Sequence, residues 1–157
     1  MRKIYKKNCT VIIPVYKNLK ITKKAIESAL PDIKLNKSEL IIINDCSPSE
    51  KIKETLNKIY NENKEFITII TNDKNLGFVR SVNKAFKLVK KTDVVILNSD
   101  VITPKNWLTK LLKESNKYKL LGTLTPLSNN STITSFPLPN IGSELLLEND
   151  VDEINKL

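Results

Sequence analysis

The chain has 157 residues, of which 40% are hydrophobic and 27% are charged, so its composition is that of a globular protein and not of a disordered one. This length suits one domain that buries roughly two thirds of the surface of its unfolded chain. The net charge is +9, but only Arg2 and Arg80 among the 26 basic residues are arginines, and no nucleic-acid-binding motif accompanies the lysines, so we do not expect a nucleic-acid partner.

Two kinds of apolar pattern alternate along the chain. Four short β-rich runs are expected to be strands, at residues 10–15, 40–43, 66–70 and 94–97. After each run, apolar residues recur at helical spacing. These predicted helix faces are Ile21, Ala25, Ile26 and Ala29; Ile52, Leu56, Ile59 and Tyr60; Phe78, Val82, Ala85, Phe86 and Val89; and Trp107, Leu108, Leu111 and Leu112.

Two of these helices have recognisable start signals. Ser47 and Glu50 have the spacing of a capping box, with Pro48 in the first helical position, and Thr103 with Pro104 predicts the start of the fourth helix. Residues 120–124 could supply a further strand. The stretch 126–141 is rich in Ser, Thr, Asn and Pro, and a short acidic amphipathic helix is expected from Ser143. We therefore expect one domain over residues 1–140 and a terminal helix over 141–157.

Four strand-helix units in series predict an α/β fold. The strands are continuous apolar runs, which is typical of a mostly parallel sheet covered by helices on both faces. In such sheets the ligand lies beyond the carboxyl ends of the strands. The four predicted ends are all polar, and three of them contain an aspartate: residues 14–18, 44–47, 71–77 and 98–100. Because parallel strands end at one edge, these residues are expected to form a site there.

Several kinds of site are excluded by what the chain lacks. It has no histidine, which removes Ser-His-Asp and Cys-His catalysis and most zinc sites. Its only glycines are Gly77, Gly122 and Gly142, so neither glycine-rich phosphate loop is present. Cys9 and Cys46 are expected at opposite ends of neighbouring strands, too far apart for a disulfide. A phosphate-bearing ligand would then need a hard cation such as Mg²⁺ or Mn²⁺, for which the carboxylate of Asp100 is suited.

Five segments in order resemble the family 2 glycosyltransferases, whose nucleotide-sugar-binding half has the GT-A fold, a Rossmann-like α/β arrangement. These segments are residues 11–16, 43–47, 75–80 with Asn83, 98–100, and 125–130 with Phe136 and Pro137. The last of them is similar to a segment, TPLSNN, found in a bacterial subset of the family. The resemblance covers nearly the whole chain.

The resemblance implies a role for particular residues. Asp45 would accept a hydrogen bond from the nucleobase, and Asp100 would hold the metal. The other residues expected to bind the nucleotide sugar surround them: Pro14, Val15, Tyr16, Asn44, Asn75, Gly77, Arg80, Asn98 and Ser99. The implied donor is a nucleoside diphosphate sugar of the UDP or dTDP type, and the implied acceptor is a glycan or a lipid-linked hydroxyl.

The chain departs from the family pattern in two ways. Asn98 replaces the first acidic residue of the D-x-D metal motif, which leaves Asp100 as the only carboxylate there. Family members also continue into an acceptor-binding half that supplies the general base, and we expect that half to be absent. Glu144, Glu148 and Asp150 are not expected to replace the base, so no catalytic residue is assigned.

Two functions from different classes follow. The chain is either an inverting, metal-assisted glycosyltransferase or its donor-binding part, or it is a nucleotide-sugar-binding module that does not catalyse transfer. A nucleic-acid binder is a weaker third hypothesis. No apolar run is long enough to span a bilayer, and residues 1–8 lack the apolar core of a secretion signal. The expected location is therefore cytoplasmic, with peripheral association at the inner face of the membrane as an alternative.

Overall fold

The computed structural model of the chain describes residues 9–129, 131 and 133–135. The chain divides into two compact units, Met1–Ile102 and Thr103–Leu157. Within the described ranges no helix is long and apolar enough to cross a membrane. The predicted boundary at residue 140 falls outside the described residues, so that domain division stays a prediction.

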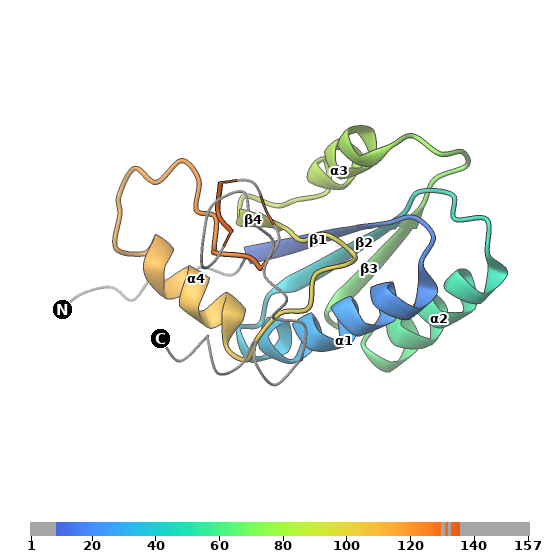
Figure 1. Ribbon diagram of the computed structural model, residues 1–157, viewed down its shortest axis with the longest axis horizontal. Coiled ribbons are helices and arrows are strands. Elements are labelled where there is room, and N and C mark those ends of the chain that lie inside the picture. The colour runs from blue at the N-terminus through green and yellow to red at the C-terminus, as the bar shows by residue number, and fades with distance from the viewer. Residues whose placement is uncertain (1–8, 130, 132, 136–157) are drawn as a thin grey trace. The chain divides into compact units, whose positions relative to one another are not determined.

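The first unit contains a four-stranded parallel sheet. Its strands are β1 (Cys9–Val15), β2 (Glu39–Asn44), β3 (Ile67–Thr71) and β4 (Asp93–Ile96), in the spatial order β3-β2-β1-β4 (Figure 1). β1 pairs with both β2 and β4, in a register that places Ile12 beside Ile41 and Ile96. All three strand pairs are parallel, which confirms the predicted α/β sheet.

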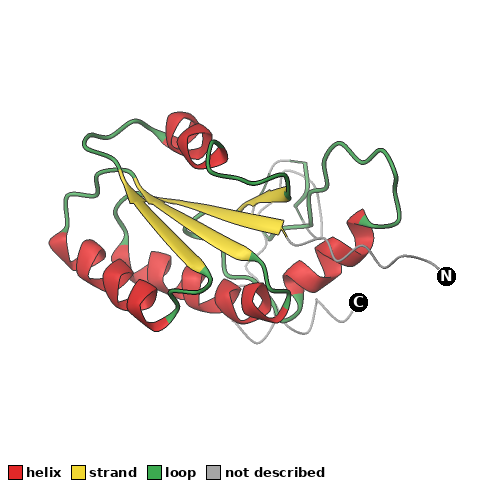
Figure 2. Ribbon diagram, turned by 180° about the vertical axis from the view of Figure 1, so that it is seen from behind, coloured by secondary structure: helices red, strands yellow, loops and turns green. Residues whose placement is uncertain are grey.

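Helices cover both faces of this sheet, as predicted. The chain passes from β1 to β2 to β3 in one direction through α1 (Leu19–Leu35) and α2 (Glu50–Glu62), and then returns through α3 (Phe78–Phe86) to β4 on the other side of β1. Crossovers between parallel strands are right-handed. A crossover that runs the other way along the sheet, as from β3 to β4, therefore places its helix on the opposite face. Figures 1 and 2 show α1 and α2 on one face and α3 on the other.

The core of this unit lies around the two central strands. Every residue of β1 is buried, and so is β2 after Glu39. On the α3 face Ile12, Ile41 and Ala85 pack together, with Ile70, Val89 and Val94 partly buried against them. β3 and β4 are more exposed because they are the edge strands of this sheet.

Two helix predictions in this unit need correction. α2 begins at Glu50 with Ser49 as its N-cap, so Ser47 and Pro48 precede the helix and the predicted capping box does not form. The buried face of α3 contains Val82 and Ala85 as predicted, but Phe78 and Phe86 are exposed. Ser81 takes a buried position in the first turn of α3, where its hydroxyl accepts a hydrogen bond from Asn72.

The second unit contains α4 (Trp107–Ser115). This helix begins three residues after Pro104, with Asn106 as an N-cap in the left-handed region, so its predicted start was too early. Trp107 and Leu108 are buried, as expected of its apolar face. Residues 120–124 form no strand, and Leu120 is 98% exposed. Gly122 interrupts that apolar run, and glycine is unfavourable within strands. The predicted helix from Ser143 lies outside the described residues.

Candidate functional site

The carboxyl ends of the four strands lie at one edge of the sheet. Backbone pairing continues slightly beyond the strands, from the Asp45 amide to the Val15 carbonyl at 2.8 Å and from the Asn72 amide to the Asn44 carbonyl at 2.9 Å. The chain order reverses between β1 and β4, and a ligand crevice is expected where the strand order switches direction. The segments that follow β1, β2, β3 and β4 therefore border one candidate site.

Asp45 accepts several hydrogen bonds at this edge. It is 4% exposed, and its carboxylate accepts three hydrogen bonds of 2.8 Å. Oδ1 accepts from the Asn72 side chain and from the Leu76 amide, and Oδ2 accepts from the Gly77 amide. Asp45 thus fixes the loop that leads from β3 to α3.

The environment of Asp45 favours its charged form. Burial raises the pKa of this carboxyl, but hydrogen bonds from Leu76, Asn72, Ser81 and Gly77 outweigh burial, so the pKa is lower than its ordinary value. Asp45 is therefore a carboxylate at neutral pH, and it can accept but not donate a hydrogen bond.

The loop between β3 and α3 depends on Gly77. Its φ of 78° and ψ of 167° lie in a region that only glycine adopts readily, although a Cβ at this position would meet no atom within 4 Å. The requirement for glycine is therefore conformational and not steric. Asn75 is exposed in this loop, and Arg80 is exposed in the first turn of α3. The predicted nucleotide contacts of Asn75, Gly77 and Arg80 stay predictions.

A hydrogen bond to Ser47, in the turn after β2, holds the turn after β1. Pro14 and Val15 are buried within the strand, whereas Tyr16 is 43% exposed beyond its end. Lys17 and Asn18 both have positive φ, at 64° and 50°. The Lys17 amide donates to Ser47 Oγ at 3.3 Å, and its ammonium lies 4.9 Å from the centre of the Tyr16 ring. Of the predicted wall residues, Tyr16 therefore offers side-chain surface to a ligand.

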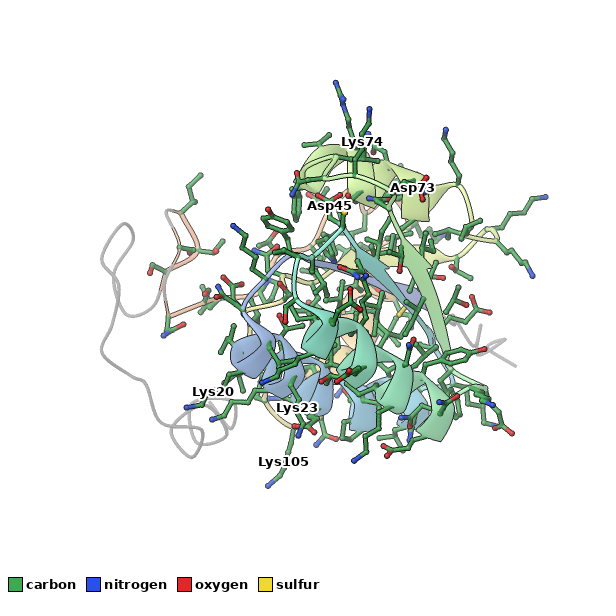
Figure 3. The ribbon with its side chains drawn as sticks, turned by 90° about the vertical axis from the view of Figure 1, so that its right-hand side faces the viewer. Lys20, Lys23, Asp45, Asp73, Lys74 and Lys105 are labelled. Atoms are coloured by element: carbon green, nitrogen blue, oxygen red, sulfur yellow. The ribbon has the colours of Figure 1, made fainter. Side chains whose placement is uncertain are left out.

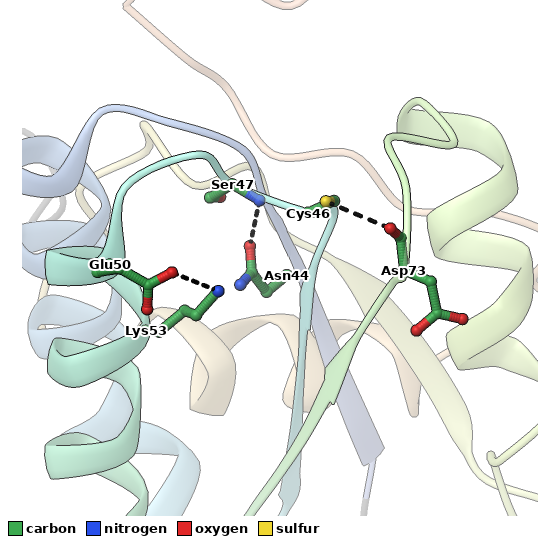
Figure 4. Close-up of polar contacts among 6 residues, drawn as sticks. All are labelled: Asn44, Cys46, Ser47, Glu50, Lys53 and Asp73. Atoms are coloured by element: carbon green, nitrogen blue, oxygen red, sulfur yellow. Dashed lines mark hydrogen bonds and ion pairs between the residues drawn. The ribbon is translucent and has the colours of Figure 1, made fainter.

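Asn44 lies beneath the turn that follows β2. It is 1% exposed, and its Oδ1 accepts the Ser47 amide at 3.0 Å, which leaves Nδ2 without a hydrogen-bond partner among the described residues (Figure 4). In the same turn Cys46 has a φ of 54°, and its thiol donates to the Asp73 carbonyl at 3.6 Å. Cys9 and Cys46 are both free, as predicted.

The segment after β4 contains the predicted metal ligand. Asn98 and Asp100 are exposed, Ser99 is half-buried, and the Val101 amide donates to the Asn98 carbonyl at 3.3 Å to close a turn. β1 lies between this segment and Asp45, so the two aspartates belong to strands roughly 10 Å apart, twice the strand spacing. The described residues include no group of three or more Asp, Glu, His or Cys side chains that could hold a metal. One exposed carboxylate instead fits Mg²⁺ or Mn²⁺ bound together with substrate phosphates.

Asn72 lies within the predicted strand end 71–77, but the sequence analysis did not single it out as a site residue. Its side-chain amide donates to Asp45 at 2.8 Å and to Ser81 at 2.9 Å, and its Oδ1 accepts from the Lys84 ammonium at 2.8 Å. It thereby links the ends of β2 and β3 to α3. The sequence signal for Asn72 was its position directly after the apolar run of β3. The carboxylate of Asp73, the next residue, was the more obvious candidate for a site residue. Figure 3 shows Asp45, Asp73 and Lys74 at this end of the sheet.

We expect Asn72→Ala to lower the free energy of unfolding by about 2 kcal/mol, because it leaves buried partners on Asp45 and Ser81 without hydrogen bonds. Thermal or urea unfolding measures this effect. Asn75→Ala is the matched control, since Asn75 is an exposed asparagine of the same loop. Equal stability of the two variants would show that the Asn72 network contributes little.

A comparison with protein-family models matches residues 10–136 to glycosyl transferase family 2. The match includes β2, β3 and β4, all of β1 after Cys9, and the carboxyl ends of all four strands. The chain belongs to glycosyl transferase family 2. This confirms the family resemblance inferred from the motifs. No curated protein sequence matches this chain.

Solved glycosyltransferase structures share the fold. The mannosyltransferase PcManGT from Pyrobaculum calidifontis, in complex with GDP-Man and Mn²⁺, is 17% identical with a TM-score of 0.65, over 81% of this chain and 37% of that one. S. aureus TarS 1–349 is 18% identical with a TM-score of 0.55, over 82% and 43%. GalNAc-T7 with UDP, GalNAc and Mn²⁺ is 15% identical with a TM-score of 0.53, over 60% and 18%. The family 2 chain thus spans less than half the length of each of these structures.

Proposed function

We propose that this chain binds a nucleoside diphosphate sugar at the carboxyl edge of its sheet, as the donor-binding part of an inverting glycosyltransferase. The sugar would pass to a hydroxyl of a glycan or a lipid-linked acceptor. The observation that carries the proposal is the family match over residues 10–136, which spans every strand end at that edge. The solved structures that share the fold include complexes with GDP-Man and with UDP, which supports a nucleotide ligand.

In this proposal Asp45 accepts a hydrogen bond from the base, and Tyr16 forms part of the wall beside it. A UDP or dTDP donor suits an acceptor at Asp45, since uracil and thymine both carry an N–H between two carbonyls. The lowered pKa of Asp45 keeps this acceptor available at neutral pH. The orphan Nδ2 of Asn44 is a buried donor that a ligand or a water molecule would satisfy, which supports the predicted role of Asn44.

Asp100 would hold Mg²⁺ or Mn²⁺, with Asn98 or Ser99 near the ribose or the sugar. The metal, when bound, would stabilise the departing diphosphate as a Lewis acid. The side chains at the edge would hold and orient the donor. Transfer with inversion also needs a base to deprotonate the acceptor hydroxyl, and we assign none of the described residues to that role.

Thermal unfolding with nucleotides tests the donor site. We expect a uridine or thymidine diphosphate, or its sugar, to raise the Tm in the presence of Mn²⁺, because a ligand at about a hundred times its dissociation constant stabilises by roughly 2.7 kcal/mol. That corresponds to several degrees for a domain of this size. Guanosine and cytidine diphosphates are the controls for base selectivity. No shift with any nucleotide would contradict the proposal.

The second candidate function is a non-catalytic nucleotide-sugar-binding module. The proposal uses Asp45 and Asp100 for binding and assigns no described residue as the base that transfer needs, so binding without transfer is the alternative. Both functions predict the thermal shift, so incubation of the purified chain with labelled donor and an acceptor separates them. Transfer of the sugar would exclude the module, whereas binding without transfer to any acceptor would support it.

A further inference from the structure

The α3 surface, which we define as residues 74–91, is strongly basic. Between Asp73 and Asp93 there is no acidic residue, and six exposed basic residues are present: Lys74, Arg80, Lys84, Lys87, Lys90 and Lys91. By contrast, α2 has three lysines and three glutamates, whose charges cancel. α1 has four lysines against Glu27 and Asp32, a net charge of +2, so the α3 surface carries the largest net positive charge of these three segments.

The same surface exposes large apolar side chains. The exposed fractions are 52% for Phe78, 66% for Val79, 41% for Phe86 and 48% for Leu88. Single exposed apolar residues are normal on proteins, whereas larger exposed apolar areas mark interaction sites. Here four exposed apolar side chains fall within eleven consecutive residues. These side chains alternate with the basic ones along the chain.

The orientation of α3 leaves this surface open within the first unit. Ser81, Val82 and Ala85 are buried, and α3 contacts β1 and β2. Among the described residues of this unit, 9–102, α3 is the only helix on its face of the sheet (Figures 1 and 2). At the amino ends of β2 and β3, a hollow of about 260 Å³ is lined by Leu88 and Lys90 together with Glu39 and Glu65. The basic surface therefore ends at these two carboxylates.

We propose that the α3 surface binds the headgroup region of an anionic lipid bilayer. The lysines would meet lipid phosphates, while Val79, Phe86 and Leu88 would enter the boundary with the acyl chains. Nucleic acid offers phosphates too, but it provides no partner for the aliphatic Val79 and Leu88. A bilayer satisfies both the charged and the apolar parts of this surface.

This surface adjoins the candidate site. α3 begins directly after Gly77, whose amide donates to Asp45 at 2.8 Å. A bilayer on the α3 surface would therefore lie close to the edge where the donor is proposed to bind, within reach of a lipid-linked acceptor. Vesicle binding itself needs no nucleotide, so it can succeed or fail independently of the proposed function.

Co-sedimentation of the full chain with lipid vesicles tests the proposal. We expect binding to vesicles that contain phosphatidylglycerol and none to phosphatidylcholine alone, with weaker binding at high salt. Each basic residue near an anionic surface contributes about a fivefold factor in binding, so the loss of three positive charges in K87E/K90E/K91E should weaken it by at least roughly 100-fold. The matched control is K20E/K51E/K58E, which changes the net charge equally through lysines of α1 and α2.

Apolar insertion has a separate test. V79S/L88S replaces exposed side chains only, and it should weaken vesicle binding several-fold at both low and high salt. Absence of binding to phosphatidylglycerol vesicles would overturn the proposal. Equal losses in the two triple variants would also overturn it, because net charge alone would then explain binding. Tighter binding of the chain to RNA than to vesicles would assign the α3 surface to nucleic acid instead.

Discussion

Asp45→Ala should lower the free energy of unfolding by about 3 kcal/mol, since hydrogen bonds to a charged acceptor contribute about 1.5–3 kcal/mol each and water replaces part of the loss. The variant removes the acceptor for Asn72, Leu76 and Gly77 together. For a domain of this size the expected fall in Tm is roughly 10 °C. Thermal unfolding measures it. The variant should also lose affinity for a uridine or thymidine nucleotide, and unaltered affinity would remove the base-contact role.

The pH dependence of stability gives an independent test of the same carboxylate. Its pKa is lower in the folded chain than in the unfolded one, so the stabilisation is fully present above the ordinary aspartate pKa of about 3.9 and is lost as pH falls through the lower folded value. Asp45→Asn cannot titrate, and its stability should fall less over this acidic window. Asp73→Ala is the control, since Asp73 is an exposed aspartate at the end of the neighbouring strand β3. If Asp73→Ala matches Asp45→Ala in thermal unfolding, or matches Asp45→Asn in the pH series, the hydrogen bonds of Asp45 are not the cause.

Asp100→Ala should abolish the part of the nucleotide-induced rise in Tm that depends on Mn²⁺, with at least a roughly tenfold loss of affinity, or about 1.4 kcal/mol. The reason is that Asp100 is the single carboxylate of the segment after β4. Without ligand its stability should change by less than about 0.5 kcal/mol, because the side chain is exposed. Nucleotide titrations with and without Mn²⁺ measure both effects.

Asn98→Asp provides the opposite change at the same turn. It restores a second carboxylate two residues before Asp100, and we expect Mn²⁺ to bind more tightly with nucleotide present. Metal-dependent binding that persists unchanged in Asp100→Ala would place the metal elsewhere. A rise in affinity for Asn98→Asp together with a loss for Asp100→Ala would locate it at this turn.

The fold was predictable because its signals are local and repeated. Each strand is a short β-branched run such as Ile12-Ile13 or Ile41-Ile42-Ile43, each is followed by helical spacing, and right-handed crossovers then restrict the order of the strands. The parallel sheet and the common edge of its polar strand ends follow from that alternation. The family resemblance added the expected nucleotide and metal, which composition and spacing could not supply.

The errors arose where tertiary contacts outweighed local patterns. Ser47 has the spacing of a capping residue, but its hydroxyl accepts the Lys17 amide from the neighbouring turn. Phe86 follows the apolar pattern of α3, yet it lies to the side of Val82 and Ala85 and is exposed. Asn72 became important only through partners 27, 9 and 12 residues away in sequence. No pattern in a single sequence reveals such long-range pairings.

The carboxylate bridge from Asp45 to the β3–α3 loop also has a consequence for the cost of binding. Leu76 and Gly77 are 31 and 32 residues from Asp45, so the loop can open only if contacts between distant parts of the chain break. Their amides should therefore exchange with deuterium slowly for a loop. A nucleotide would meet an edge that is already ordered, and little conformational entropy would be lost there on binding. Preorganisation of the donor edge would thus have been achieved when the chain folded.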